Sequence, residues 1–317
     1  MEILVTNDDG YRAKGIKVLT EIMRQFGRVT VIAPKHHQSG MSMAASLGLK
    51  QIAYKKLSSE EIERDTYTLP RHASGEACIP GTDGGQGTTE PAEWSYLDAT
   101  PASCVKFGFN TCFLDRMPDV VVSGINHGSN ATTASCYSGT LGAAAEAALN
   151  GVPAIGVSLE TLDPDADFSA VEKYFPGIFR MLTDNPPAKK GIYYNINFPD
   201  IPAGKIKGIR AAHQGNGRWV KEFIPWNPGI YSRYGITPEM LGQSSTPSAE
   251  EGEILYMMAG EYEDDPGNIH GADHWFTRDG YISIVAHNID TTDYGEVSRL
   301  KRLGLDTDFP MTDASSH

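Results

Sequence analysis

Cysteine is scarce in this chain of 317 residues, with only Cys78, Cys104, Cys112 and Cys136 present. No two of them form a Cys-x-x-Cys pair. Four cysteines in a chain of this length do not make the disulfide framework of a small secreted domain. We therefore expect free thiols in a reducing compartment, the cytoplasm.

Long apolar runs and clusters of positive charge are also missing. The first residues, Met1-Glu2-Ile3-Leu4-Val5, lack the basic leader of a signal peptide, and no stretch approaches the length of a membrane span. The formal net charge is -13. Nucleic-acid polymers and anionic membranes are therefore not expected as partners. An acidic protein that handles an anionic substrate needs positive charge supplied locally.

Three catalytic signatures are missing as well. The sequence contains neither the Gly-x-Ser-x-Gly of a nucleophile elbow nor the Gly-Lys-Ser/Thr of a phosphate-binding loop. Its first apolar run leads into Asn7-Asp8-Asp9-Gly10 and not into Gly-x-Gly-x-x-Gly. This difference disfavours a dehydrogenase.

The remaining composition is that of a globular protein with a sizeable core, with 40% apolar and 21% charged residues. In the first two-thirds, short β-branched runs alternate with helical patterns, which predicts an α/β fold with a largely parallel sheet. We expect strands at 3–6, 29–33, 120–122, 154–157, 193–198, 254–258 and 281–285. Helices are expected at 16–26, 101–109, 140–150 and 297–303.

Two stretches rich in turn-forming residues interrupt this pattern, Thr66 to Trp94 and Gly215 to Gly252. Both are expected to be long loops. We divide the chain into a catalytic core, 1–200, with the insertion near 66–94, and a C-terminal region, 201–317, that mediates oligomerisation. Its aromatic residues are of the kind enriched at interfaces, namely Trp219, Trp226, Tyr231, Tyr234 and Trp275.

Two adjacent carboxylates, Asp8 and Asp9, directly follow the first predicted strand. Ligands of open parallel sheets bind beyond the carboxyl ends of the strands. Mg²⁺ and Mn²⁺ prefer oxygen ligands, so the pair is typical of a hard-cation site. The alternative is an ordinary tight turn, because Asn, Asp and Gly are turn residues.

Other polar loops are expected to converge on the same edge of the sheet. Ser39 follows the second strand and Asn126 follows the strand at 120–122. Both offer neutral oxygens that would complete a metal site without adding charge. His127, the His36-His37 pair and the cluster of His270, Asp273 and His274 give weaker signals, which loop or solvated residues also explain.

An anion site is expected where Tyr137-Ser138-Gly139-Thr140 leads into the Ala-rich helix. The backbone N–H groups at a helix N-terminus point outward and carry partial positive charge. Capping of the helix by Ser138 or Thr140 is the other interpretation, and a capped helix end can still bind phosphate.

Taken together, these motifs resemble the SurE (stationary-phase survival protein) family of 5'/3'-nucleotidases. The resemblance covers most of the chain in the right order. It is carried by Ile3-Leu4-Val5-Thr6-Asn7-Asp8-Asp9-Gly10, Ala33-Pro34 with Ser39-Gly40, Ser123-Gly124-Ile125-Asn126-x-Gly128-x-Asn130, Tyr137-Ser138-Gly139-Thr140 and Asn195-Ile196-Asn197-Phe198-Pro199. The usual Thr-Pro after the strand at 281–285 is missing.

The resemblance implies a Rossmann-like three-layer core with a parallel-rich sheet and extended C-terminal β-hairpins exchanged between subunits, in a homodimer or homotetramer. It implies one divalent metal ion per subunit, Mg²⁺ or Mn²⁺. The metal ligands would correspond to Asp8, Asp9, Ser39 and Asn126, and the phosphate contacts to Asn130, Ser138, Gly139 and Thr140.

The expected activity is hydrolysis of nucleoside 5'-monophosphates, and of 3'-monophosphates as a further substrate class, with Asp8 and Asp9 as the catalytic residues. A nucleotide-sugar transferase and a non-enzymatic nucleotide-binding module on a similar fold are the alternatives.

Overall fold

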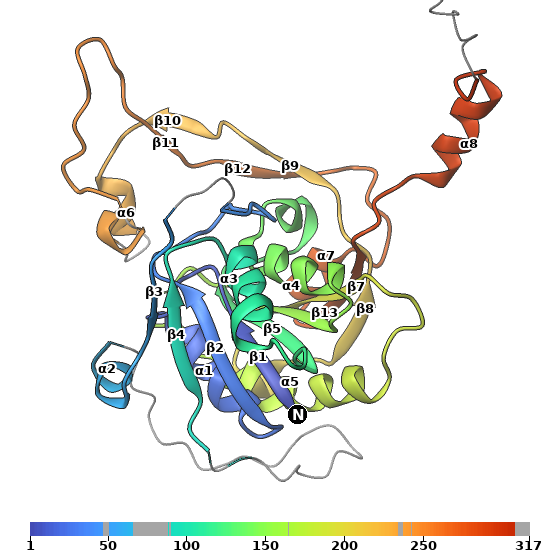
Figure 1. The fold of residues 1–317 in the computed structure, drawn as a ribbon. Helices are drawn as coiled ribbons and strands as arrows, with labels where there is room; N and C mark the ends of the chain where they lie inside the picture. Colours follow the sequence, from blue (N-terminus) through green and yellow to red (C-terminus); the bar gives the residue numbers. More distant parts are fainter. Residues whose placement is uncertain are drawn as a thin grey trace, which may run out of the picture.

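The computed structural model of the protein describes residues 1–46, 51–65, 88, 90–163, 165–233, 237–241 and 243–307. Its centre is a nine-stranded sheet with the strand order β3-β4-β2-β1-β5-β6-β7-β13-β8 (Figure 1). The strands are β1 (Glu2–Thr6), β2 (Arg28–Pro34), β3 (Tyr54–Lys56), β4 (Glu93–Leu97), β5 (Val120–His127), β6 (Ala154–Leu159), β7 (Ile192–Phe198), β8 (Ile209–Ala212) and β13 (Ile282–Asn288).

The middle of this sheet is parallel. Strands β4, β2, β1, β5, β6 and β7 run in one direction, while β3 and β13 pair antiparallel with β4 and β7. The carboxyl ends of β1, β2, β5 and β6 therefore lie at one edge. The loops that follow these strands meet there.

Helices cover both faces of the sheet and make three layers. Helices α1 (Lys14–Met23) and α5 (Ser169–Asp184) contribute to one core, in which Phe175 and Phe179 are fully buried. Helices α3 (Pro101–Phe107) and α4 (Gly139–Leu149) contribute Val105 and several alanines to the core on the other face. The predicted α/β architecture is confirmed.

The remaining helices are short. They are α2 (Ser59–Asp65), α6 (Gly229–Arg233), α7 (Asp273–Arg278) and α8 (Tyr294–Arg302), with single turns η1 (Gly108–Cys112), η2 (Thr132–Cys136), η3 (Ala203–Lys205) and η4 (Pro238–Leu241). None of these helices, nor any other in the described residues, is long and apolar enough to cross a membrane.

Local signals at helix ends act as the sequence indicates. Thr100 caps α3, its side chain accepting a hydrogen bond from the Ser103 N–H, and Pro101 takes the first helical position. Gly151 follows α4 with a φ of +77°. That left-handed conformation suits glycine and ends the helix where the composition predicts.

An arm formed by the C-terminal region extends across and beyond the body (Figure 1). Strand β9 (Gly217–Val220) pairs with β12 (Glu261–Asp264), and β10 (Phe223–Pro225) pairs with β11 (Tyr256–Met258). The same region also completes the central sheet, because β8 and β13 pair with each other and β13 pairs with β7. The division at residue 200 stays a prediction.

Four expectations from the sequence need correction. Residues Ser123 to His127, read as loop, continue β5 and pair with β6 across a register shift. Glu93 and Trp94, read as loop, begin β4, although most of the 66–94 insertion lies outside the described residues. Gly215 to Gly252 contains β9, β10, α6 and η4. Helix α5 was not predicted at all, and it contains Pro176. Polar residues, Gly and Pro are typical of loops, so they hide strands and helices that are stabilised by tertiary contacts and not by local preference.

Candidate metal and phosphate site

The site begins with the turn after β1. Asn7 is fully buried and closes this turn, because its side-chain Nδ2 donates to the Gly10 carbonyl and its side-chain Oδ1 accepts from the Gly10 N–H. Asn7 therefore makes the ordinary turn that the sequence allows. The carboxylates of Asp8 and Asp9, between these two residues, take no part in the hydrogen bonds of the turn and lie at the carboxyl edge of the sheet.

Asp8 is almost fully buried against the first turn of α4. Its Oδ1 accepts a hydrogen bond from the Thr140 hydroxyl at 2.6 Å. Burial, and then the neighbouring Asp9 charge, raise the pKa of Asp8 from 3.8 to about 7, although the bond from Thr140 opposes the change. Two adjacent carboxylates of which one is buried repel each other, and a divalent cation that binds between them would relieve this repulsion.

Gly139 leaves room for Asp8. A Cβ at this position would lie 2.8 Å from the Asp8 Cβ and 3.1 Å from the Gln38 carbonyl oxygen. Any side chain here would push the helix start away from the carboxylate. Ser138 caps the helix by accepting a hydrogen bond from the Leu141 N–H at 3.1 Å, so the capping interpretation is confirmed beside the expected anion site.

Asp9 lies between two loops. Its Oδ2 accepts a hydrogen bond from the His127 N–H at 3.1 Å and lies 3.3 Å from the His127 Nδ1. Its Oδ1 lies 3.5 Å from the Nδ1 of His37. His37 is only a weak candidate from the sequence, and its position in the loop after β2 is the one signal that could have identified it.

Asn126 and Ser39 lie in the neighbouring segments. The Asn126 amide nitrogen donates to the Gly128 carbonyl at 2.9 Å, which leaves its side-chain oxygen as an acceptor without a hydrogen bond among the described residues. Ser39 is exposed and follows Gln38, whose N–H donates to the Asp8 carbonyl at 2.7 Å. The oxygens of these two residues have the donor chemistry that a hard cation needs, so they fit the predicted set.

Asn130 is fastened by side chains that the sequence did not single out for a role. Its N–H donates to the Asn197 Oδ1 and its side-chain amide to the Ser158 hydroxyl, both at 2.8 Å. Asn195 donates to the Asn130 carbonyl and accepts from Asn197. Asn195 and Asn197 occupy alternate positions of β7 and are fully buried. Buried polar groups need hydrogen-bond partners, so this spacing of two asparagines in a strand is the signal that could have pointed to their role.

The other polar groups do not add metal ligands. No group of three or more His, Cys, Asp or Glu side chains in the described residues is arranged to hold a metal ion. Asp273 binds backbone N–H groups at Thr132, Gly215 and His274. A transition-metal site at His270, Asp273 and His274 is therefore not formed.

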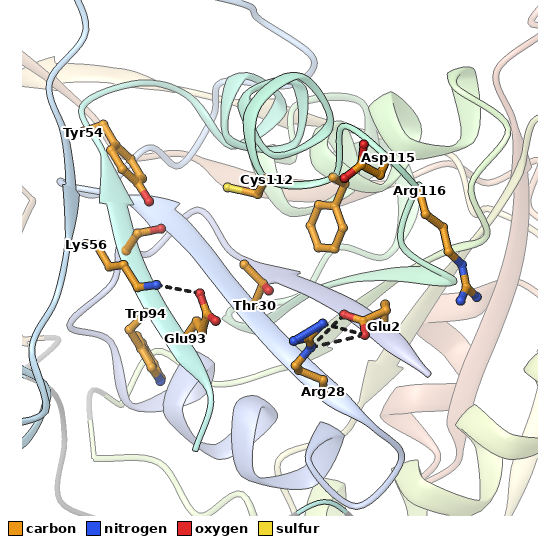
Figure 2. Close-up of a pocket in the computed structure, with 12 residues that line it drawn as sticks. Glu2, Arg28, Thr30, Tyr54, Lys56, Glu93, Trp94, Cys112, Asp115 and Arg116 are labelled. Carbon is orange, nitrogen blue, oxygen red and sulfur yellow. Dashed lines mark hydrogen bonds and ion pairs between the residues drawn. The ribbon is translucent and has the colours of Figure 1, made fainter. Parts of the chain in front are cut away.

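A cavity of about 480 Å³ lies at the opposite end of the sheet, at the amino ends of β1, β2 and β4 (Figure 2). The three cations that line it are already paired, Arg28 with Glu2, Lys56 with Glu93 and Arg116 with Asp119. The cavity thus has no unpaired cation among these groups to attract an anion.

The chain is similar to known proteins along most of its length. A family model described as "Survival protein SurE" matches residues 3–221. The chain belongs to the SurE family. It is 35% identical over 301 residues to a protein of Cytophaga hutchinsonii named 5'-nucleotidase SurE, covering 95% of each chain. A Pelotomaculum thermopropionicum protein of the same name is 33% identical, covering 96% of this chain and 95% of the other.

The SurE fold is confirmed by a solved structure. The crystal structure of the SurE protein from Aquifex aeolicus aligns with a TM-score of 0.67 over 96% of this chain and 100% of that chain, at 24% sequence identity. Which residues of this chain bind the metal and the phosphate stays a prediction.

Asp8→Asn should stabilise the metal-free protein at pH 8, by about 1 kcal/mol or more, because it removes a charge that burial and Asp9 disfavour. The gain should shrink as the pH falls below about 7, since Asp8 then takes up a proton in the folded wild type but not in the unfolded chain. Urea unfolding in chelator from pH 5 to 8 measures this. Equal stability of both proteins at pH 8 would contradict the electrostatics.

Proposed function

We propose that this chain hydrolyses nucleoside 5'-monophosphates to nucleoside and inorganic phosphate, with a divalent metal ion, Mg²⁺ or Mn²⁺, bound to Asp8 and Asp9. The observation that carries the proposal is the buried Asp8 carboxylate with Asp9 beside it, at the N-terminus of α4, in a chain related along its length to proteins named 5'-nucleotidase. The names of these relatives give no support to a sugar transferase or to a non-enzymatic binding module.

The chemistry requires positive charge at the phosphate, in a protein whose net charge is -13. A divalent ion held by Asp8, Asp9, Ser39 and Asn126 would supply Lewis-acid charge and acidify water. The chain itself contributes the partial positive charge at the start of α4, where the Thr140 N–H donates to Asp8 and the Leu141 N–H donates to the Ser138 hydroxyl. Asp9 is held in place by the His127 N–H.

A cytoplasmic location belongs to the proposal. Cys104, Cys112 and Cys136 are free thiols, as expected in a reducing compartment.

The proposal also includes a homodimer or homotetramer joined through the arms. One face of the β10–β11 ladder exposes Phe223, Met258 and Tyr256, and Phe223 and Met258 are paired neighbours, each 67% exposed. The aromatic residues of this region, which are expected to need burial, differ in their exposure within one chain. Tyr231 is buried and Trp219 is 42% exposed, while Tyr234 lies outside the described residues.

The activity is tested by phosphate release from 5'-AMP and 5'-GMP with Mn²⁺ or Mg²⁺, with 3'-AMP as the comparison. Chelator should abolish the release, and Asp9→Asn should lower kcat by at least about a hundredfold, since even indirect partners of a metal cost 10- to 100-fold. Asp98→Asn, at an exposed carboxylate after β4, is the matched control and should keep full activity. Undiminished turnover in chelator would reject the metal mechanism.

Gly139→Val should raise KM about tenfold or more and lower kcat, because the new side chain would collide with Asp8 and with the Gln38 carbonyl. Gly204→Val is the control, since a Cβ there has nothing within 4 Å. Steady-state kinetics with 5'-AMP decide the matter. Wild-type constants for Gly139→Val would remove the start of α4 from the site.

Light scattering at low micromolar concentration tests the assembly and should give the mass of a dimer or tetramer. Replacing both Phe223 and Met258 by Ser should shift the mass toward the monomer, because it removes the paired apolar surface of the arm. Leu114→Ser, at a residue 73% exposed outside the arm, should leave the mass unchanged. A monomeric wild type would overturn this part of the proposal.

A further inference from the structure

One fully buried carboxylate lies outside the predicted metal site. Asp273, the first residue of α7, has no exposed surface, and its carboxylate accepts three backbone hydrogen bonds. Oδ2 accepts from the Thr132 N–H at 3.0 Å, and Oδ1 accepts from the N–H groups of Gly215 at 3.0 Å and His274 at 2.9 Å. A buried charge is retained only when such donors compensate it.

The bond to Thr132 joins this carboxylate to the loop that contains Asn130, a predicted phosphate contact. Thr132 has a φ of +60°, a conformation that β-branched residues rarely adopt, so the surrounding structure must impose it. The residue lies between the two predicted phosphate contacts, Asn130 on one side and the Ser138–Thr140 turn on the other. The direction in which the chain leaves Asn130 therefore determines where the turn lies.

The other bonds of the carboxylate fix the base of the arm. Gly215 lies two residues before the start of β9, and the Thr133 hydroxyl donates to the Gly217 carbonyl at 3.0 Å. Segment Thr132–Cys136 is thus tied at two adjacent residues to the start of the arm. A side chain 141 residues away from Thr132 holds this junction together.

We propose that Asp273 is a positioning residue of the reaction. By holding the Thr132–Cys136 segment against the base of the arm, it sets the spacing between Asn130 and the Ser138–Thr140 turn, and so the affinity of the site for the phosphoryl group. This inference rests on the proposed nucleotidase function. Asp273 acts through the backbone of the segment and takes no part in the chemistry itself.

Asp273→Asn tests the proposal with little change of shape. The amide of asparagine must present its NH₂ either to the Thr132 N–H or to the N–H groups of Gly215 and His274, so a donor faces a donor. KM for 5'-AMP and the inhibition constant of inorganic phosphate should rise between about tenfold and a hundredfold, as expected for displaced binding groups. kcat should fall less, and the Mn²⁺ concentration for half-maximal activity should not change.

Glu146→Gln is the matched control, because Glu146 is a carboxylate only 2% exposed near the far end of α4, paired with Lys106 at 2.8 Å. It should lower the unfolding midpoint and leave the phosphate inhibition constant at the wild-type value. A purely structural role of Asp273 would give its variant this same pattern. That result, or unchanged kinetics, would overturn the proposal.

Amide hydrogen exchange of peptides covering 129–136 gives a measurement that does not depend on turnover. Exchange there should be faster in Asp273→Asn and unchanged in Glu146→Gln. If Asp273→Asn does not fold, Thr133→Val decides instead, since it removes only the bond to Gly217. It should raise both the exchange and the phosphate inhibition constant, and wild-type values of both would reject the proposal.

The two hypotheses can fail separately. If the wild type releases no phosphate from any nucleoside monophosphate, the proposed function is wrong. The exchange comparison then still judges whether Asp273 positions the segment, and unchanged exchange in its variant would reject that as well.

Discussion

Two neighbouring carboxylates at the end of the central strand β1 impose the main electrostatic constraint on this fold. Burial and the charge of Asp9 raise the pKa of Asp8 to about 7, because negative charge on both neighbours is disfavoured where water is largely excluded. Hydrogen-bond donors from the surrounding segments partly compensate that charge. Thr140 donates to Asp8, the His127 backbone donates to Asp9, and Gly139 keeps the start of α4 close. A bound cation would complete this compensation.

The framework that holds these groups is rigid because the same strands form the core. Strand β7 carries Ile196 and Phe198 into the apolar layer and turns Asn195 and Asn197 toward the loop at Asn130. Leaving such buried amide groups without partners would cost about 1–3 kcal/mol each, so the network specifies one position for the loop. Packing and site geometry are therefore determined together.

The arm contrasts with this core. Its two short ladders bury little on their own, and several of its large apolar side chains are exposed in a single subunit. Its base is nevertheless tied to the loop beside the site, through Thr133 at Gly217 and Asp273 at Gly215. The arm and the loop beside the candidate site are thus connected through hydrogen bonds between side chains and the backbone.

Much of the fold could be predicted because its signals are local. The apolar runs of β1 and β2 predict strands, and the cap at Thr100 and the glycine at 151 mark helix ends as expected. Where tertiary pairing outweighs local preference, prediction failed. The polar end of β5, from Ser123 to His127, is a strand because β6 satisfies its backbone, and α5 forms despite Pro176.

The sequence alone determined that Asp8 and Asp9 follow a buried strand, that a glycine turn begins an Ala-rich helix, and that the chain resembles the SurE family. These features depend only on short segments and on the order of those segments along the chain, so they can be read from the sequence. Only the tertiary structure decided that Thr140 binds Asp8, that Asn195 and Asn197 fasten Asn130, and that Asp273 accepts the Thr132 N–H. Such contacts join residues 65 to 141 positions apart, and their partners are chosen by strand order and packing, which no local pattern contains.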